Sequence, residues 1–371
     1  MDLCPSLIYL SQADFGLHSS KADETAEPFE AFWEVQMVKL GTSIGGRRAI
    51  AATDWTTIAD DAKLLEDLGF DFTTVGQHSF TPEFPSPAPL TRMAWLAGKT
   101  ERLNLLTGVV ILPLYPPASI AEQVAEISVL SGGRIMLGAG VGYRQYEFDG
   151  YQIDMKTRGR RMDEAVQLLH QVFQTGEFEF HGKFYPMPKL PLAPRPASPP
   201  PIFVGGTSEP ALNRAARWGD GLLTENMSTL EVMSGYLGRY RQLTRGAGRQ
   251  PGSVVLYRNA YLSTSRKEIE EDFIPAVLKE HLGYRSHGAA ENVDDEDTFY
   301  ARAAKGETIG LEELDGRMLA GDPEQMIRQI KTWEKAIGMT HINLMGVGPE
   351  TSPEARRKTL ELWGKEVIPY V

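Results

Sequence analysis

Strand and helix patterns alternate eight times along this chain, and that alternation limits its possible folds more than any other feature. Each short apolar segment is followed by a stretch with apolar residues at helical spacing. Regular alternation predicts a parallel sheet, and eight units predict a closed (β/α)8 barrel, whereas six would favour an open doubly wound sheet. The expected strands are residues 37–43, 70–75, 103–110, 134–137, 202–204, 221–223, 254–262 and 341–345. The expected helices are residues 54–68, 87–99, 117–130, 158–173, 209–218, 229–245, 323–337 and 353–367.

Three segments depart from the alternation. Residues 1–36 mix apolar, polar and acidic stretches without a clear period, so we expect an N-terminal arm before a barrel domain at 37–371. Aromatic and polar residues alternate at 176–187, which predicts a hairpin before the fifth strand. The proline-rich segment 188–201 predicts a stiff, extended connector. After the seventh strand we expect an irregular, partly helical insertion at 266–318, which is either a lid over the site or decoration.

Composition excludes several classes of function. The net charge of −11 argues against a wide nucleic-acid surface, because binding phosphates needs clustered Lys and Arg. The single cysteine, Cys4, excludes an internal disulfide and a thiolate metal site, and no two of the seven histidines have metal-ligand spacing on a helix. No apolar run approaches the ~20 residues of a membrane span, and the N-terminus lacks the pattern of a signal peptide. We therefore expect a cytoplasmic protein without a metal.

In a (β/α)8 barrel the site lies at the C-terminal ends of the strands. Gln77 and His78 follow the second strand. His78 is placed to hydrogen-bond a cofactor ring or to relay a proton near neutral pH; a loop histidine satisfied by backbone is the alternative. Thr107, Gly108 and Val109 end the third strand, where glycine either permits close approach of the backbone to a ligand or packs the barrel.

A glycine-rich loop after the fourth strand is a candidate for holding a phosphate or a flat ring. Gly140, Gly142 and Tyr143 lie in it, and its alternate glycines leave backbone N–H groups exposed. The spacing does not match the dinucleotide-binding fingerprint, and no helix opens directly behind it. The loop is therefore a weak signal by itself.

The loop after the fifth strand carries a stronger signal for an anion. Two glycines, two hydroxyls and a helix N-terminus converge there, at Gly205, Gly206, Thr207 and Ser208. This combination binds anions, and an ordinary Ser208 N-cap is the alternative. A rival phosphate loop is 346–348 after the last strand, and Glu225 and Asn226 after the sixth strand are further polar candidates.

Taken together, these segments resemble the bacterial-luciferase-like superfamily of flavin-dependent monooxygenases and deazaflavin-dependent oxidoreductases. The resemblance covers nearly all of residues 37–371. It rests on the order and spacing of the stretches "SGGRIMLGAGVG", "GRRMDEA", "PPIFVGGTSEPALNRAARWGDGLL" and "GDPEQMIRQIKTWEKAIGMTHINLM". The hairpin before the fifth strand and the insertion after the seventh are similar as well.

The resemblance implies a role for His78, which falls where luciferases carry the first histidine of a Glu-His-His run tied to catalysis. Here the run reads Gln77-His78-Ser79, so the flanking Glu and the second His are absent. Gly108-Val109 matches a strand-three bulge, often a non-prolyl cis peptide, that supports the middle ring of the cofactor.

The resemblance also implies that Gly206, Thr207 and Ser208 bind the cofactor phosphate. Val141 stands where luciferase places an arginine, so phosphate binding would depend on backbone and hydroxyls. Tyr115 replaces a basic or histidine residue that is common after the third strand.

From this resemblance we expect a monooxygenase that uses reduced FMN and O2 to oxygenate a small organic substrate. No nicotinamide domain is evident, so a separate NAD(P)H:flavin reductase would supply the flavin, and a homodimer is expected. The first alternative is hydride transfer with the deazaflavin coenzyme F-420, whose acidic tail would need a basic groove. Such a groove could be built from Arg144, Lys156, Arg158, Arg160 and Arg161. The second is a non-catalytic flavin-binding protein, and a metal-dependent hydrolase is disfavoured because no His-x-His pair occurs.

Overall fold

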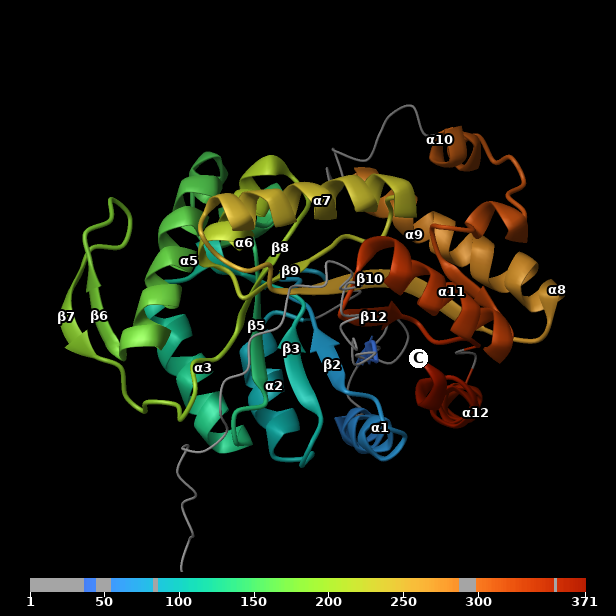
Figure 1. Ribbon diagram of the computed structural model, residues 1–371, viewed down its shortest axis with the longest axis horizontal. Helices are drawn as coiled ribbons and strands as arrows, with labels where there is room; N and C mark the ends of the chain where they lie inside the picture. The colour runs from blue at the N-terminus through green and yellow to red at the C-terminus, as the bar shows by residue number, and fades with distance from the viewer. Residues whose placement is uncertain (1–36, 45–54, 83–85, 287–297, 350–351) are drawn as a thin grey trace, which may run out of the picture. The chain divides into compact units, whose positions relative to one another are not determined.

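The computed structural model describes residues 37–44, 55–82, 86–286, 298–349 and 352–371. The expected N-terminal arm at residues 1–36 lies outside the described residues. Eight parallel strands form a closed ring in the described part, because each strand pairs with the next and the last pairs with the first (Figure 1). They are β1 (Lys39–Ser43), β2 (Phe72–Val75), β3 (Asn104–Thr107), β5 (Ile135–Gly140), β8 (Ile202–Gly205), β9 (Gly221–Leu223), β10 (Ser253–Leu262) and β12 (His341–Met345). The predicted (β/α)8 barrel is confirmed.

A helix follows each barrel strand, as the apolar periodicity predicted. These helices are α1 (Trp55–Asp67), α2 (Pro89–Ala97), α3 (Pro117–Ser131), α5 (Arg158–Thr175), α6 (Glu209–Trp218), α7 (Leu230–Gly246), α11 (Pro323–Ile337) and α12 (Pro353–Glu366). Their ends follow local chemistry: Gly132 and Gly338 terminate α3 and α11 in the left-handed conformation. Asp322 and Gln325 form a reciprocal capping box at the start of α11.

The third and fourth strands differ from the prediction at their C-terminal ends. The expected strand 103–110 breaks after Thr107 and resumes as the two-residue β4 (Val110–Ile111). β5 continues to Gly140, so the first half of the expected glycine loop is strand. A short helix that the sequence analysis missed, α4 (Gln145–Gly150), follows, and then the 3-10 turn η2 (Met155–Thr157). A second 3-10 turn, η1 (Leu112–Leu114), precedes α3.

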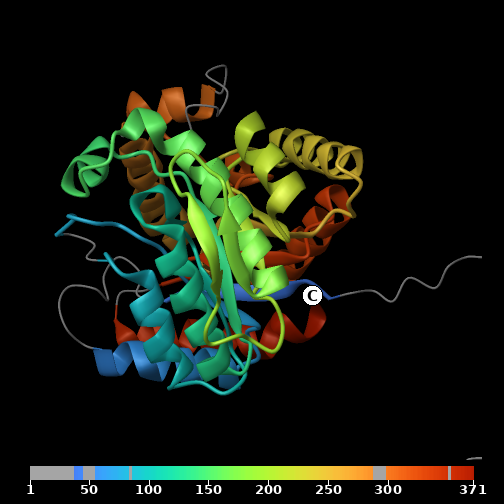
Figure 2. The ribbon, with the colours of Figure 1, turned by 90° about the vertical axis from the view of Figure 1, so that its left-hand side faces the viewer.

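The predicted hairpin is present as β6 (Glu177–Phe180) and β7 (Met187–Pro191), an antiparallel pair (Figure 2). The extended connector therefore begins later than expected, since Pro188 and Pro191 belong to β7. Proline is tolerated there because β7 is an edge strand of a two-stranded sheet.

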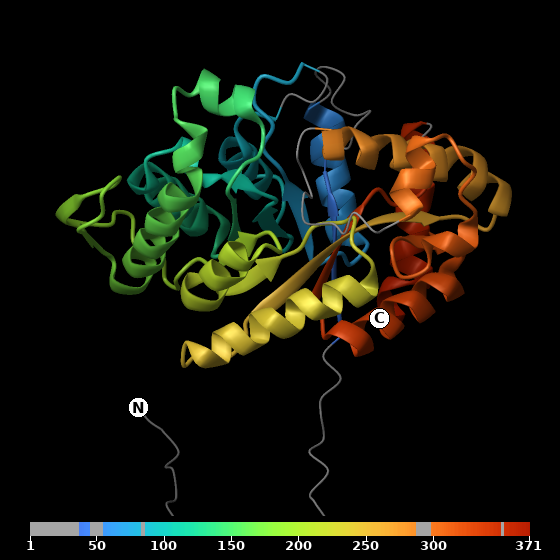
Figure 3. The ribbon, with the colours of Figure 1, turned by 90° about the horizontal axis from the view of Figure 1, so that it is seen from above.

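The insertion after β10 is more ordered than expected. Its helical segments and one added strand are α8 (Arg266–Glu268), the π-helical η3 (Ile269–Phe273), α9 (Ile274–Ser286), α10 (Thr298–Ala304), η4 (Leu311–Leu314) and β11 (Leu319–Gly321). β11 extends the sheet by pairing with the end of β10, and a final 3-10 turn, η5 (Ile368–Tyr370), follows α12. The insertion has a small apolar core of its own, in which Tyr261 of β10 stacks on Phe273 at 5.0 Å. Figure 3 places the insertion and the β6–β7 hairpin on opposite sides of the barrel.

Large side chains fill the barrel interior near the N-terminal ends of the strands, which we call the closed end. The ring of Phe72 lies 5.7 Å from that of His341, and the ring of Phe203 lies 6.3 Å from it. Glycines make room for these rings: a Cβ at Gly41 would fall 2.4 Å from the Phe72 ring, and one at Gly221 would fall 2.6 Å from the Phe203 ring. Burial lowers the pKa of His341 to about 4, with a smaller contribution from Lys39.

Candidate active site

The C-terminal ends of the strands, which we call the open end, form a floor of small residues around Gly108 and Val109. The peptide between these two residues is cis, as the resemblance implied. The Val109 side chain lies between Gly140 and Gly205, whose added Cβ atoms would come within 2.4 and 3.2 Å of its methyl groups. A Cβ at Gly76 would fall 2.9 Å from the Gly108 carbonyl oxygen. Because Gly140 and Gly205 have no side chains, they leave the space that the Val109 side chain fills in the floor.

A closed ring of three polar side chains lies in the same layer, and the sequence analysis missed it. Thr74 donates to Asn343 Oδ1 at 3.1 Å, and Asn343 Nδ2 donates to Ser43 at 3.2 Å. The hydroxyls of Ser43 and Thr74 lie 2.8 Å apart, which completes the ring. The signal that could have found it is polar residues at inward positions near the ends of β1, β2 and β12.

Two side chains predicted to contact the cofactor, those of Thr107 and Gln77, form hydrogen bonds within the protein. The fully buried Thr107 hydroxyl donates to the Gly138 carbonyl and accepts from the Gly138 N–H, both at 2.8 Å. The Gln77 side chain is buried; its Oε1 accepts from Ile111 N at 2.9 Å, and its Nε2 donates to Tyr115 Oη at 2.7 Å. Both side chains hold the floor and its neighbouring loop in place.

His78 lies at the mouth of the barrel in the loop after β2. Its backbone pairs with that of Ser86 in both directions, at 2.9 and 3.3 Å. The Ser86 hydroxyl donates to the Gly76 carbonyl at 2.5 Å, which fastens the loop to the end of the strand. The His78 side chain remains partly exposed, so it is the imidazole that this loop presents at the open end.

Side chains from three loops form one side of the mouth, the tyrosine wall: Gln77, Ser79, Tyr115, Glu147 and Tyr151. The hydroxyls of Tyr115 and Tyr151 lie 3.2 Å apart, and that of Tyr151 lies 3.4 Å from Ser79 Oγ. The Ser79 N–H donates to Glu147 at 2.8 Å. Burial raises the pKa of the Glu147 carboxyl, and burial together with Tyr151 raises the pKa of Tyr115. The wall therefore keeps the Tyr115 phenol protonated and its loops joined.

The insertion is joined to the barrel by a second buried network, the histidine clasp: Asn226, Asn259, His281 and Tyr300. His281 Nε2 lies 2.8 Å from Asn259 Oδ1, and His281 Nδ1 lies 2.8 Å from Tyr300 Oη. Asn226 Nδ2 donates to Asn259 Oδ1 at 2.8 Å. Asn226 was a polar candidate; His281, which is fully buried, gave no signal in the sequence. The clasp fixes α9 beside strand β10 and the loop after β9.

Tyr143 faces the insertion from the loop after β5. Burial raises its pKa, and the phenol of Tyr284 on α9 adds to the shift. Gly142 before it has a φ of +76°, and an added Cβ there would fall 2.6 Å from Ile111 and 2.9 Å from Phe148. Gly142 thus turns the chain so that Tyr143 approaches α9.

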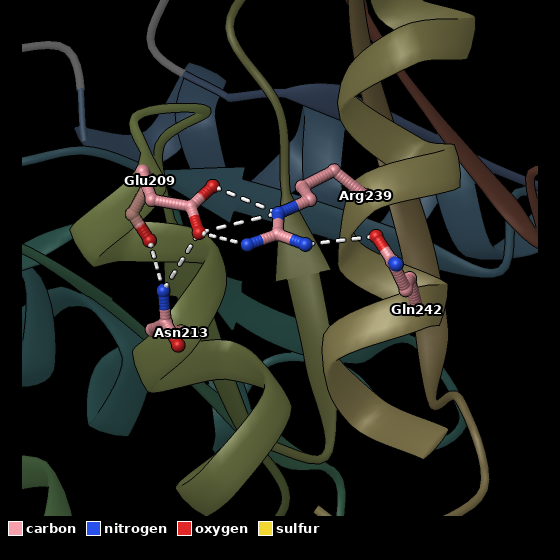
Figure 4. A network of polar contacts seen from close by, with 4 residues as sticks. All are labelled: Glu209, Asn213, Arg239 and Gln242. Atoms are coloured by element: carbon pink, nitrogen blue, oxygen red, sulfur yellow. Dashed lines mark hydrogen bonds and ion pairs between the residues drawn. The ribbon is translucent and has the colours of Figure 1, made fainter. Parts of the chain in front are cut away.

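The loop of Gly206, Thr207 and Ser208 leads into α6 at the open end. Gly206 has a φ of +117°, and its N–H donates to Leu223. Ser208 precedes α6 without capping it through its side chain, so the ordinary N-cap alternative is not what the structure contains. The acidic side chain of the first turn, Glu209, is directed to Asn213 and Arg239, as Figure 4 shows. The hydroxyls of Thr207 and Ser208 precede the helix N-terminus, and the charge of the first-turn carboxylate is balanced by Arg239.

The rival loop 346–348 is used for packing. The Val347 carbonyl accepts from Trp363 Nε1 at 2.8 Å and from Leu262 N at 3.0 Å. A Cβ at Gly348 would fall 2.6 Å from Thr359 and 2.7 Å from the Leu262 carbonyl oxygen. The Glu225 carboxylate is likewise occupied, since it accepts from the backbone of Ser228 at 3.0 Å.

Most of the cations expected to form a basic groove are engaged. Arg144 donates to Tyr146 Oη at 2.9 Å. Arg158 donates to the Met155 carbonyl at 3.2 Å, and Arg161 donates to Thr157 at 3.0 Å while its guanidinium lies over the Phe184 ring. Arg160 also lies over Phe184, at 5.6 Å from the ring centre. The set is divided between the β5 loop, which carries Arg144, and the start of α5, which carries Arg158, Arg160 and Arg161.

Within the ranges that the structure describes, no three His, Cys, Asp or Glu side chains are grouped so that they could hold a metal ion. No helix in those ranges is long and apolar enough to cross a membrane.

Known proteins are similar to this chain over most of its length. An uncharacterized protein, Rv0940c, of Mycobacterium tuberculosis is 31% identical over 258 residues, covering 64% of this chain and 88% of that protein. An F420-dependent glucose-6-phosphate dehydrogenase of Nocardia farcinica is 27% identical over 326 residues, covering 84% of this chain and 93% of that protein.

A solved structure shares the fold. It is the oxygenating constituent of 3,6-diketocamphane monooxygenase from Pseudomonas putida in complex with FMN, with a TM-score of 0.72 and 19% identity over 90% of this chain and 98% of that one. The family model of luciferase-like monooxygenases matches residues 37–341. The chain therefore belongs to the luciferase-like monooxygenase family.

Proposed function

We propose that this chain is a flavin-dependent monooxygenase that uses reduced FMN and O2 to oxygenate a small organic substrate. The observation that carries the proposal is the floor at the open end, where Val109 lies between Gly140 and Gly205. Beside it, the hydroxyl residues Thr207 and Ser208 precede α6, and the Glu209 carboxylate in the first turn of that helix is paired with Arg239. A planar ring needs a floor without projecting side chains, and a phosphate needs N–H and hydroxyl donors. Both requirements are met on adjacent strands, β5 and β8.

The residues divide the work as follows. Gly108 and Val109 carry the ring system, Thr207 and Ser208 hold the phosphate, and His78 holds or delivers a proton at the mouth. Bound reduced flavin supplies two electrons to O2, so that one oxygen atom enters the substrate and the other leaves as water. The tyrosine wall and the insertion limit the access of water on either side.

FMN is favoured over the deazaflavin by the engaged arginines. An acidic tail needs a continuous basic surface, but Arg158 and Arg161 already bond to neighbouring backbone and side chains. Hydride transfer with coenzyme F-420 is the second candidate, and the 27% identity with an F420-dependent dehydrogenase favours it. A non-catalytic flavin-binding protein is disfavoured by the complete ring of eight units.

Anaerobic titration of the purified protein with reduced FMN and, separately, with reduced coenzyme F-420 tests the proposal. Absorbance and fluorescence report binding. We expect tight binding of reduced FMN and weaker binding of the deazaflavin. Tight binding of the deazaflavin alone would replace the proposal by hydride transfer, and binding of neither would overturn both.

A double variant, T207A/S208A, tests the phosphate loop. Losing two hydroxyl donors to a charged phosphate predicts FMN affinity lower by about tenfold or more. Thr229→Ala is the matched control, since Thr229 is a hydroxyl at the start of α7 that caps its own helix through Val232 N. An equal loss of affinity in the control would contradict a phosphate site at Thr207 and Ser208.

We also propose a homodimer, a partner NAD(P)H:flavin reductase and a cytoplasmic location. Light scattering after gel filtration checks the first. Oxygen consumption with and without an added NADH-dependent flavin reductase checks the second: a chain that turns over with NADH alone needs no partner.

A further inference from the structure

We infer that Tyr257 is a positioning residue of the cofactor floor, because its hydroxyl occupies the space below Gly108 that any side chain at position 108 would take. The inference rests on the proposed function and adds to it a residue from β10, on the opposite side of the barrel ring from β3. Tyr257 acts through Gly108 and does not itself contact the reacting atoms.

The geometry is specific to this pair. A Cβ added to Gly108 would stand 2.1 Å from Tyr257 Oη and 3.3 Å from Tyr257 Cζ. Carbon and oxygen atoms that are not bonded do not approach to 2.1 Å, so the tyrosine hydroxyl at 257 requires glycine at 108. The next neighbour, Thr74 Cβ, would be 3.3 Å away, a contact that a small shift relieves.

Tyr257 cannot easily move aside. Its backbone N–H donates to Thr224 Oγ1 at 3.1 Å, and its carbonyl accepts from the fully buried Arg258 at 2.8 Å. Its ring packs on the apolar layer that includes Leu106 and Val255. The phenol is therefore a rigid support for the Gly108 backbone.

The Tyr257 hydroxyl contributes volume here more than hydrogen bonding. Among the described residues, no hydrogen bond of normal geometry reaches Tyr257 Oη. The hydroxyl of its neighbour Thr74 is already shared with Ser43 and Asn343. Burial raises the pKa of Tyr257, and Thr74 opposes the shift, so the phenol stays protonated. A buried hydroxyl retained without a full partner needs another reason, and the support of Gly108 supplies one.

Five variants test the inference: G108A, Y257F, G108A/Y257F and the control pair G140A with G140A/Y257F. Each is titrated with reduced FMN, and the visible absorbance and circular dichroism of bound FMN report the surroundings of the ring. G108A is expected to bind FMN about tenfold to a hundredfold more weakly with a changed spectrum, as overpacking a rigid contact implies. G108A/Y257F is expected to recover most of the affinity and the wild-type spectrum, because the 2.1 Å contact is gone.

The control separates a specific coupling from a general loosening of the floor. A Cβ at Gly140 would meet Val109, at 2.4 Å, and not Tyr257. Y257F is therefore expected to leave the G140A defect unchanged. Rescue of both glycine variants, or of neither, would overturn the inference, as would a G108A protein that binds FMN like the wild type.

Failure of the proposed function is distinguishable from failure of this inference. A wild-type protein that binds neither FMN nor coenzyme F-420 overturns the proposed function and, with it, the positioning role. A wild-type protein that binds FMN while Y257F fails to rescue G108A overturns only the role of Tyr257. Melting temperatures of all variants show whether a loss of binding is a loss of fold.

Discussion

The two ends of the barrel interior are built from the same strands and differ in what those strands project inward. Moving two residues along β2, β8 and β12 changes Phe72 to Thr74, Phe203 to Gly205 and His341 to Asn343. The side-chain period of a strand is two, so both members of each pair face the barrel interior. The closed end is filled by rings, whereas the open end is made of glycines, hydroxyls and amides. A single sheet thus separates a packed layer from the proposed ligand-binding layer along its own axis.

Removing a ring from the closed end should have the largest effect on stability and a much smaller effect on the floor. Phe72→Ala leaves a cavity next to Gly41 and His341, and we expect the free energy of unfolding to fall by about 3–5 kcal/mol. Urea unfolding measures this loss. The FMN affinity of the folded variant should match the wild type, and a parallel loss of affinity would show that the two ends are not separable.

Acid should weaken the closed end through His341. Its pKa is lowered from an ordinary value near 6.5 to about 4, so the folded state binds fewer protons than the unfolded state between these values. The stability due to the neutral imidazole is complete above pH 6.5 and is lost as the pH falls toward 4. The loss amounts to about 3 kcal/mol.

Unfolding of the wild type and of His341→Asn between pH 7 and pH 4 checks this prediction. Asparagine does not titrate, so the variant should lose less stability on acidification, whatever its stability at neutral pH. His181→Asn, at an exposed hairpin turn, is the control and should keep the wild-type pH dependence. The same pH dependence in His341→Asn would mean that acid acts elsewhere.

Removing a hydrogen bond at the open end should lower the free energy of unfolding only slightly and should lower the FMN affinity more clearly. Tyr115→Phe removes the hydroxyl that bonds Gln77 at 2.7 Å and lies 3.2 Å from Tyr151. We expect the free energy of unfolding to fall by about 1 kcal/mol. Because Gln77 holds the β4 backbone at Ile111, FMN affinity should fall by a larger factor than in a matched control.

Tyr240→Phe is that control, since Tyr240 is a buried tyrosine on α7 whose hydroxyl accepts from Gly252 N at 3.2 Å. Thermal unfolding compares the stability of the two variants, and FMN titration compares their affinity for the cofactor. Equal binding by the two would separate the tyrosine wall from the cofactor site.

The sequence predicted the parts of the fold that depend on local patterns. The eight units, the hairpin and the helix ends follow from apolar periodicity and from glycine or capping residues such as Gly338 and Asp322. The strand ends to which the candidate site is assigned could also be counted along the chain. The six-residue helix α4 was missed because it is too short for a period to show.

The partners of individual site residues could not be predicted. Gln77 and Thr107 stand at the expected strand ends, yet their polar atoms are taken up by Ile111 and Gly138, which lie 34 and 31 residues away. His281 meets Asn259 across 22 residues that include the start of the insertion. Such contacts are set by the packing of the whole barrel, and no spacing in the sequence encodes them.

The pairing of β1 with β12 has a consequence for how the chain is made. Ser43 and Asn343, which close the polar ring at the open end, are 300 residues apart. At translation rates of about 5–20 residues per second, β12 leaves the ribosome roughly 15–60 seconds after β1. Throughout that time β1 has an edge without its final partner, and the contact is about as non-local as the chain allows. The open end, with the floor on which the proposed cofactor rests, can therefore be completed only after β12 has been made.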